Sequence, residues 1–507
     1  DVVAAFQLGM PRFRDAVEGV AEGEALVVPL LTSAGYFLRQ VLPEQFGSAC
    51  SIRGRGPRVT TPIGSLRSIR AEFVAAVAEL ARQASDDVTV IVVGHGTTRN
   101  AASGAATREV AGLIGRAIPR ALVLAAFLDE APSVEEVACI VATGDVIVAP
   151  WLIGGGHHAR EDVGRRLAGL RPGTRTHTGP TLGELPGFVA AIHTLIDWHS
   201  PEREYRIGTR SSPLARRQAE IVWAALAATG VRTSVVEVST IGDRDRERAI
   251  DAFETDGPFT DELEVAVANG DIDLAVHSLK DLPLDRGDIG KLTAIAAVLE
   301  RAPAGEVLVS RGGLLLAELA PGARVGTSSR RRAAQLRAIR PDLVPVPMRG
   351  PVDQRILQVL SDGPGALDAA ILAEAGLVRL GASSVIAERL SIDAFVPDPG
   401  QGALAVTARA DDHHAGELAA SIGHEPTRRA VTAEREAARL IEADGTVLVA
   451  AYAEVMGDAA EMVRLRVRAV DRVTGEFRDV EVHSHDPCDA ACEAAAVVMA
   501  QRGEVLV

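Results

Sequence analysis

The stretch VTVIVVGHG, residues 88–96, is a run of apolar residues that ends in a glycine turn. Unbroken runs of this kind are typical of strands that are buried on both faces of a parallel sheet. ATREVAGLIGRAI (106–118) follows with helical spacing, and ALVLAAFL (121–128) and DVIVAP (145–150) are two further apolar runs. The alternation predicts an α/β fold with a doubly wound parallel sheet, whose ligands bind beyond the carboxyl ends of the strands.

The same pattern occurs twice in the first 194 residues. Four residues each have an identical partner 121 positions later: Phe6 and Phe127, Pro11 and Pro132, Pro29 and Pro150, Gly35 and Gly156. Self-similarity at a fixed offset indicates a repeated structural unit. We therefore expect two doubly wound units, 1–85 and 86–194, with the N-terminus of the first one missing.

Histidines follow two of the strands expected in the second unit. His95 comes directly after 88–94, and His157 and His158 come after DVIVAP. Neutral imidazoles suit first-row divalent metals, and the flanking glycines let a flat ligand approach the backbone. The alternative is that these are ordinary loop histidines, but two such positions at strand ends of one unit favour a site.

The motifs VVGHGTTRN (92–100) and APWLIGGGHHARED (149–162) resemble the sirohydrochlorin chelatase family over about residues 1–175. The resemblance implies insertion of a divalent metal substrate (Co, Fe or Ni) into a sirohydrochlorin-type macrocycle. It implies metal-handling roles for His95 and His158, with His157 and Asp129 as further candidates. In the first unit Tyr36 and Phe37 replace the histidines, so we expect that unit to be degenerate.

The bulk composition narrows the class of protein. A chain of 507 residues with 47% hydrophobic and 24% charged residues is long enough for several globular domains. Its net charge of −15 argues against nucleic-acid binding. Its four cysteines are scattered, and it has no apolar run of 18 residues, so we expect no disulfide framework, no membrane span and a cytoplasmic location.

The polar stretch LIDWHSPEREY (195–205) predicts a linker over 195–203, and a second module follows it. That module contains five ordered motifs: HSLKDLP (277–283), VGTSSRRRAAQL (325–336), MRGPVDQRI (348–356), DAAILAEAGLVRLG (368–381) and PDPGQGALAV (397–406). Together they resemble hydroxymethylbilane synthase, also called porphobilinogen deaminase, from residue 205 to 507. The resemblance implies two periplasmic-binding-protein-like domains, 204–305 with 397–418 and 306–396, and a small α/β domain, 423–507.

Arginines and serines recur at expected turns and element ends of this module. The candidate ligand-binding residues are Arg210, Ser211, Ser212, Ser328, Ser329, Arg331, Arg332, Arg349, Arg355 and Arg379. Guanidinium groups bind carboxylates in a bidentate manner, and serine hydroxyls complete such sites. A single arginine is most often a solvated surface charge, but SSRRR followed by MRG indicates a site for a ligand with several carboxylates.

Asp281 and Lys280 lie in HSLKDLP, directly after the apolar stretch DIDLAV. The resemblance implies that Asp281 accepts hydrogen bonds from pyrrole N–H groups and stabilises the positive charge that develops as ammonia leaves. A carboxylate suits that role. Lys280 is one of only two lysines, the other being Lys291, which favours a retained site.

The stretch RLIEADGTVLVAAYAEV (439–455) departs from the family pattern. Aligning it on YAE places Gly445 where the family carries the cysteine that anchors a covalent dipyrromethane primer. A thioether requires a thiol, so we predict that the covalent dipyrromethane is absent.

Three functions are compatible with these patterns. The first is a tetrapyrrole-biosynthesis fusion in which the N-terminal half inserts metal and the C-terminal half binds porphobilinogen or linear or cyclic tetrapyrrole polycarboxylates. The second is a working hydroxymethylbilane synthase with non-covalent priming. The third is a non-enzymatic tetrapyrrole carrier or sensor. The oligomeric state stays open.

Overall fold

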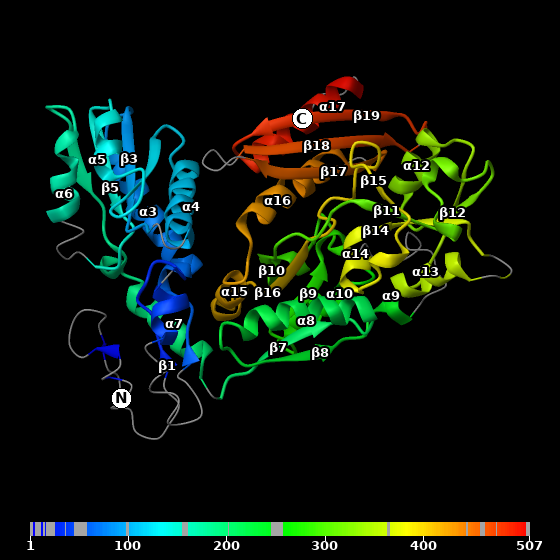
Figure 1. Ribbon diagram of the computed structural model, residues 1–507, viewed down its shortest axis with the longest axis horizontal. Helices are drawn as coiled ribbons and strands as arrows, with labels where there is room; N and C mark the ends of the chain where they lie inside the picture. Colours follow the sequence, from blue (N-terminus) through cyan, green and yellow to red (C-terminus); the bar gives the residue numbers. More distant parts are fainter. Residues whose placement is uncertain are drawn as a thin grey trace. The chain divides into compact units, whose positions relative to one another are not determined.

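The computed structural model contains two compact units (Figure 1). Asp1–Arg203 with Ala228–Arg232 form the first unit, and Glu204–Ala227 with Thr233–Val507 form the second. The structure describes residues 4–5, 12–13, 16, 26–35, 37–44, 58–97, 101–154, 161–200, 202–244, 257–361, 363, 366–442, 445–456, 462–472 and 474–502.

A four-stranded parallel sheet forms the centre of the first unit, in the order β4-β3-β5-β6. Its strands are β3 (Val88–Gly94), β4 (Leu122–Phe127), β5 (Asp145–Pro150) and β6 (Arg175–Thr178). Every residue of β3 and β5 is buried, as expected of strands covered on both faces. The prediction of an α/β fold with a parallel sheet is therefore confirmed for this unit.

Helices accompany this sheet on both faces. Ile91 and Val93 of β3 pack in one apolar cluster with Val134 and Val137 of α5 (Val134–Ile140). Residues of opposite parity in β3 face the other way, and α4 (Ala101–Ala117) and α3 (Arg67–Gln83) contact β3 and β5. The short α6 (Val163–Arg166) and the longer α7 (Phe188–Trp198) complete the helices of the unit after β5.

The expected linker over 195–203 is wrong at its start. Helix α7 continues to Trp198, and both Leu195 and Trp198 are buried. These two apolar side chains lie at i and i+3 on one face of the helix, so burying them extends the helix through residues that look like a turn-forming stretch.

The first repeat is described only in part. β1 (Leu26–Val27) and β2 (Arg58–Val59) form a two-stranded parallel pair, and Phe37–Val41 form a single π-helical turn. Tyr36 and most of residues 1–25 and 45–57 lie outside the described residues, so a second doubly wound sheet over 1–85 stays a prediction.

The second unit begins with a five-stranded mixed sheet, in the order β10-β16-β9-β7-β8. Its strands are β7 (Tyr205–Thr209), β8 (Thr233–Glu237), β9 (Leu274–Ser278), β10 (Thr293–Val298) and β16 (Leu404–Arg409). β16 comes from much later in the chain and runs antiparallel to both β9 and β10. The helices near this sheet are α8 (Pro213–Ala227), α9 (Ile241–Arg244), α10 (Asp261–Asn269), α11 (Ile289–Leu292) and α15 (His413–Ala420).

A second five-stranded sheet follows, in the order β13-β12-β14-β11-β15. Its strands are β11 (Glu306–Ser310), β12 (Arg324–Thr327), β13 (Val344–Pro347), β14 (Ala369–Ala373) and β15 (Glu388–Leu390). β12 is parallel to β13 and β14, and each is followed by a helix: α12 (Arg330–Ile339), α13 (Val352–Leu360) and α14 (Glu374–Arg379).

The last part of the chain is an antiparallel meander covered by two helices. Its strands are β17 (Val447–Met456), β18 (Met462–Asp471) and β19 (Phe477–Ser484), with α16 (Glu425–Ile441) and α17 (Pro487–Arg502). The apolar cluster between them consists of Ala, Val, Leu and Ile side chains. No helix in the described ranges of either unit is long and apolar enough to cross a membrane.

Candidate binding cleft and candidate metal site

The second unit contains a cleft of about 1650 Å³ at the carboxyl ends of strands from both five-stranded sheets. Its lining comes from the segments that follow β7, β9, β12, β13 and β14 and from the loop before β16. The turn between β18 and β19 adds part of the rim. Pockets for drug-sized ligands usually measure about 300–1,000 Å³, so this cleft has room for a larger ligand than a single pyrrole.

Every ligand-binding residue expected from the sequence of this unit lines the cleft: Arg210, Ser211, Ser212, Lys280, Asp281, Ser328, Ser329, Arg331, Arg332, Arg349, Arg355 and Arg379. In all, the lining contains ten Arg or Lys side chains against four aspartates. The cleft is thus strongly cationic in a chain whose net charge is −15. Such a lining favours a ligand with several negative charges.

Arg332 is fixed inside the wall of the cleft. Ser329 caps the N-terminus of α12, which places Arg332 in the first turn, where it is only 4% exposed. Its guanidinium donates to Glu306 at 2.8 Å and to the side-chain oxygen of Gln401 at 3.0 Å. Glu306 is 1% exposed, so this is a buried ion pair that supports the fold as well as the cleft.

Arg331 and Lys280 meet a carboxylate that the sequence reasoning did not single out. Asp398 accepts from Nε of Arg331 at 2.5 Å, and its other oxygen lies 3.7 Å from Nζ of Lys280. Lys280 also donates to Gln401 at 2.9 Å. Burial opposes ionisation of Asp398, but Arg331 and Lys280 hold the pKa of its carboxyl well below its usual range. PDPGQGALAV contains this aspartate, yet nothing in the motif indicates which cations it meets.

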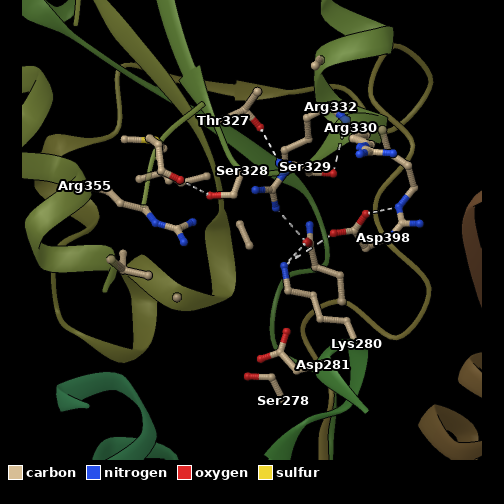
Figure 2. A pocket seen from close by; sticks show the side chains of 18 of the residues that line it. Ser278, Lys280, Asp281, Thr327, Ser328, Ser329, Arg330, Arg332, Arg355 and Asp398 are labelled. Carbon is tan, nitrogen blue, oxygen red and sulfur yellow. Dashed lines mark hydrogen bonds and ion pairs between the residues drawn. The ribbon is translucent and has the colours of Figure 1, made fainter. Parts of the chain in front are cut away.

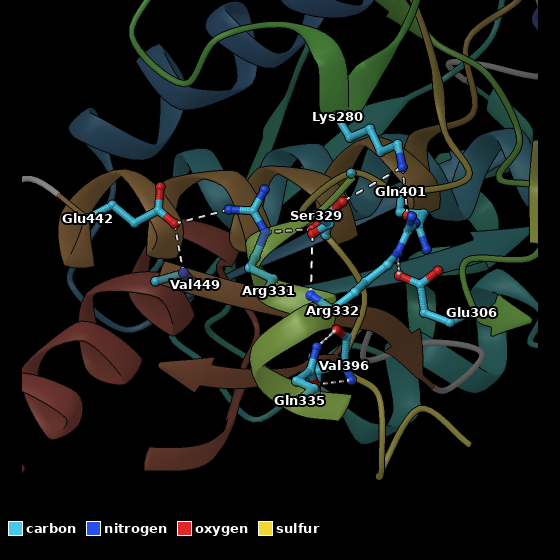
Figure 3. Close-up of polar contacts among 12 residues, drawn as sticks. Lys280, Glu306, Ser329, Arg331, Arg332, Gln335, Val396, Gln401, Glu442 and Val449 are labelled. Atoms are coloured by element: carbon cyan, nitrogen blue, oxygen red, sulfur yellow. Dashed lines mark hydrogen bonds and ion pairs between the residues drawn. The ribbon is translucent and has the colours of Figure 1, made fainter. Parts of the chain in front are cut away.

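A second carboxylate, Glu442, follows α16 and approaches Arg331 from another side. Its oxygen lies 3.3 Å from the guanidinium and also accepts from the backbone N–H of Val449 at 2.7 Å. Figure 3 shows Arg331 directed toward Glu442, while Arg332 turns the other way to Glu306 and Gln401. Although burial disfavours the charged guanidinium, Asp398 and Glu442 raise the pKa of Arg331.

Arg355 and Arg379 have a different environment. Each donates to a backbone carbonyl, Arg355 to Gly350 and Arg379 to Gly402, both at 2.7 Å. Burial, together with the charges of Arg332 and Arg349, lowers the pKa of Arg355 to about 10. Burial alone lowers the pKa of Arg379 to about 10. Cations in this state gain from an incoming carboxylate, because its negative charge offsets the loss of hydration that burial imposes on the guanidinium.

Asp281 lies at the floor of the cleft, in the single turn Leu279–Asp281 that follows β9. Figure 2 shows its carboxylate below Lys280 and Asp398, with Arg355 on the opposite wall. Within the described residues, no side chain or backbone N–H is hydrogen-bonded to this carboxylate. Burial and the charge of Arg332 lower the pKa of Lys280 beside it. Asp281 is thus placed to accept N–H groups of a ligand.

The first unit brings His95 and Asp129 together at one edge of its sheet. β3 and β4 are parallel neighbours, so the residues that follow them are adjacent, and the N–H of Asp129 donates to the carbonyl of His95 at 2.8 Å. Nδ1 of His95 lies 4.0 Å from the Asp129 carboxylate, and the two side chains are 53% and 69% exposed. An exposed imidazole and carboxylate are suitable ligands for a first-row divalent metal.

The other two histidines of the expected metal site, His157 and His158, lie outside the described residues. Among the residues that are described, no group of three or more His, Cys, Asp or Glu side chains has a geometry suited to holding a metal ion. The described part of this edge therefore supplies a pair of candidate ligands.

Family models match part of each unit. Residues 205–417 match the family model "Porphobilinogen deaminase, dipyromethane cofactor binding domain". The porphobilinogen deaminase of Desulforudis audaxviator is 45% identical over 251 residues, which is 49% of this chain and 79% of the relative. The chain belongs to the porphobilinogen deaminase family. The enzyme of Roseiflexus sp. is 40% identical over 304 residues, 59% of this chain and 97% of the relative.

Residues 89–197 match the CbiX family model. A solved structure titled as CbiX, the terminal enzyme for biosynthesis of siroheme in denitrifying bacteria, is 26% identical and covers 35% of this chain and 76% of its own, with a TM-score of 0.30. The chain is thus a fusion of a CbiX-like region with a porphobilinogen deaminase, and both parts are related to tetrapyrrole biosynthesis.

The residues of this porphobilinogen deaminase unit do not fit a covalently attached dipyrromethane. Gly445, at the position aligned with the anchoring cysteine, has φ of 70° and offers no thiol. A Cβ there would meet no atom within 4 Å among the described residues, so the left-handed backbone conformation, and not crowding, favours glycine at this position. Cys488 and Cys492, the cysteines of this unit, do not line the cleft.

Proposed function

We propose that the porphobilinogen deaminase unit binds porphobilinogen or a linear oligopyrrole carrying several carboxylates, and holds it without a covalent primer. The observation that carries this proposal is the arrangement of ten cationic side chains around Asp281 in one cleft of about 1650 Å³. Carboxylate arms would bind guanidinium groups, and pyrrole N–H groups would donate to the floor carboxylate. Both contacts match the chemistry of the ligand.

Two roles for the bound pyrrole are consistent with this cleft. In one, the unit condenses porphobilinogen with non-covalent priming, and Asp281 stabilises the positive charge left when ammonia departs. In the other, the unit carries or senses a pyrrole without turnover. Gly445 favours the second role over normal chain elongation, because no thioether holds the growing chain in place.

Intact mass and absorbance of the purified full chain, with and without porphobilinogen, separate these roles. The proposal expects an unchanged protein mass in both samples. A mass increase equal to two linked pyrroles contradicts the absence of a covalent primer. An unchanged mass with accumulation of a linear tetrapyrrole in solution supports non-covalent priming, whereas binding without product supports a carrier.

We further propose that the CbiX-like region inserts a divalent metal substrate, Co, Fe or Ni, into a sirohydrochlorin-type macrocycle. The supporting observation is the pair of His95 and Asp129 at the carboxyl edge of the parallel sheet. An imidazole there can accept pyrrole protons or deliver the metal. His158, with His157 as an alternative, is proposed as a second participant from the sequence motif alone.

A further inference from the structure

Asp398 occupies a place in the cleft where a ligand carboxylate would bind. One of its oxygens accepts from Arg331 at 2.5 Å, and the other lies 3.7 Å from the ammonium of Lys280. Both partners line the cleft, and the Asp398 side chain is 12% exposed. Figure 2 shows Asp398 beside Lys280 on the wall opposite Arg355. Its contacts are those that a carboxylate arm of a pyrrole would make with the same two cations.

The loop that carries Asp398 holds the carboxylate in place. The backbone N–H of Gln401 donates to the carbonyl of Asp398 at 2.9 Å, and that of Gly400 donates to Glu434 at 2.7 Å. Gly402 has φ of 86°, and a Cβ there would lie 2.4 Å from the carbonyl oxygen of Ala302. The turn fixes the backbone of Asp398, and the contacts of its carboxylate with Arg331 and Lys280 hold the side chain between these two cations.

The two walls of the cleft therefore differ in how much counter-charge they already have. On the Asp398 side, Arg331 is opposed by Asp398 and Glu442, and Arg332 is opposed by Glu306. On the other side, Arg355 and Arg379 donate to backbone carbonyls. A ligand carboxylate gains more at Arg355 and Arg379, because at Arg331 it must compete with a fixed negative charge at close range.

We propose that Asp398 is a built-in occupant of one carboxylate subsite and a specificity determinant of this cleft. It excludes ligand carboxylates from Arg331 and Lys280 and directs them to Arg355 and Arg379. The cleft then favours ligands with few carboxylate arms over ligands with many. This inference rests on the proposed function, because it presupposes that the cleft binds pyrrole polycarboxylates.

The test is a calorimetric titration of the full chain with two probes, porphobilinogen and the octacarboxylate uroporphyrin I. Wild type is compared with Asp398→Asn, which keeps the side-chain shape and removes the charge. Asp353→Asn is the matched control, because Asp353 lines the same cleft on α13 but is exposed and belongs to no ion pair described for this wall. The double variant Asp398→Asn with Arg331→Gln removes the subsite itself.

We expect Asp398→Asn to bind uroporphyrin I about tenfold more tightly than wild type, which is the size of effect that one close charge pair has on binding. Asp353→Asn should change the affinity by less than about threefold, as exposed charges do. The double variant Asp398→Asn with Arg331→Gln should bind uroporphyrin I no more tightly than wild type. Porphobilinogen, a smaller ligand, should bind wild type and Asp398→Asn within about threefold of each other.

Several outcomes overturn the inference. If wild type binds porphobilinogen but Asp398→Asn gains no affinity for uroporphyrin I, the inference is wrong while the proposed function stands. If Asp398→Asn and Asp353→Asn gain the same affinity for uroporphyrin I, the effect comes from the net charge of the cleft, and the inference is also contradicted. If neither protein binds either probe, the proposed function fails and the inference fails with it. If both Asp398→Asn and Asp398→Ala fail to fold, Asp398 is needed as a counter-ion for stability, and the proposed carboxylate subsite is rejected.

Discussion

Single residues of the cleft show two kinds of cation. Some are paired with a buried carboxylate and support the fold, and others contact backbone carbonyls and are available to bind a ligand carboxylate. Arg332 is paired with a buried glutamate, whereas Arg355 and Arg379 donate to carbonyl oxygens. All three were predicted from the sequence to bind the ligand, because a sequence motif does not show which residue an arginine contacts in the folded chain. The distinction decides which substitution tests binding and which tests stability.

Replacing Arg355 or Arg379 by alanine should weaken the binding of porphobilinogen by about tenfold or more, since hydrogen bonds to charged groups contribute about 1.5–3 kcal/mol. Calorimetry of each variant measures the effect, and circular dichroism checks that the fold is kept. Arg217→Ala is the control, because this exposed arginine of α8 pairs with Glu220 and does not line the cleft. Unchanged affinity in both cleft variants would place the ligand elsewhere.

Replacing Arg332 by alanine should instead destabilise the unit by about 3–5 kcal/mol, because it leaves the buried Glu306 without its ion-pair partner. Urea denaturation measures the loss. Arg337→Ala, an exposed position on the same helix, should change stability by at most about 0.5 kcal/mol. Adding Glu306→Ala to Arg332→Ala should recover part of the lost stability. If the two substitutions lower the free energy of unfolding additively, the ion pair does not stabilise the unit.

The candidate site was only partly visible in the sequence. The serines, arginines, lysine and aspartate that line the cleft were found because they sit in motifs that follow apolar strands. Asp398 was missed because its partner Arg331 lies 67 positions away, and only the folded chain brings them together. Glu306 and Glu442 were missed for the same reason.

At the scale of elements, a buried polar network joins α10 to the first five-stranded sheet. Glu264 of α10 accepts from Thr293 of β10 at 2.5 Å and from Thr407 of β16 at 2.6 Å, and lies 2.9 Å from Nε2 of His277 on β9. Burial opposes its ionisation, yet these contacts, led by His277, lower the pKa of Glu264 to about 2. The network ties four elements beneath the segment that carries Asp281.

This network predicts an acid-sensitive stability. The pKa of Glu264 is lower in the folded chain than the ordinary value of 4.5, so its stabilising contribution is complete above pH 4.5 and is lost as the pH falls to about 2. Urea denaturation between pH 6 and pH 2.5 should show a decrease in unfolding free energy that is smaller in Glu264→Gln. Glu220→Gln, at an exposed position of α8, serves as control. Parallel pH profiles for wild type and Glu264→Gln would refute this role.

Strands β3 and β5 of the first unit followed from sequence alone, because unbroken runs of Val, Ile and Ala are typical of strands buried on both faces of a parallel sheet. The end of α7 could not be predicted from the sequence. Its last residues mix polar and apolar side chains, and only the burial of Leu195 and Trp198 extends the helix through them. Local composition predicts a turn there, and tertiary packing overrides it.

At the scale of the whole molecule, the chain joins two regions related to tetrapyrrole biosynthesis, and each proposal belongs to one unit. For the first unit, His95→Ala should strongly reduce metal insertion into sirohydrochlorin, measured as loss of free-macrocycle fluorescence on adding Co²⁺. His158→Ala is expected to act in the same way. His193→Ala is the control, because this histidine of α7 is exposed and lies on a helix rather than at the strand edge. If the double variant His95→Ala with His158→Ala inserts metal as fast as wild type, the metal site must lie elsewhere.

For the second unit, we propose that the cleft binds a pyrrole polycarboxylate without a covalent bond. Calorimetric titration of the full chain with porphobilinogen at low and high salt tests it most directly. We expect saturable binding that weakens as salt is raised, because salt screens the attraction between carboxylates and the cationic lining. The absence of any binding heat up to millimolar porphobilinogen at low salt would contradict it.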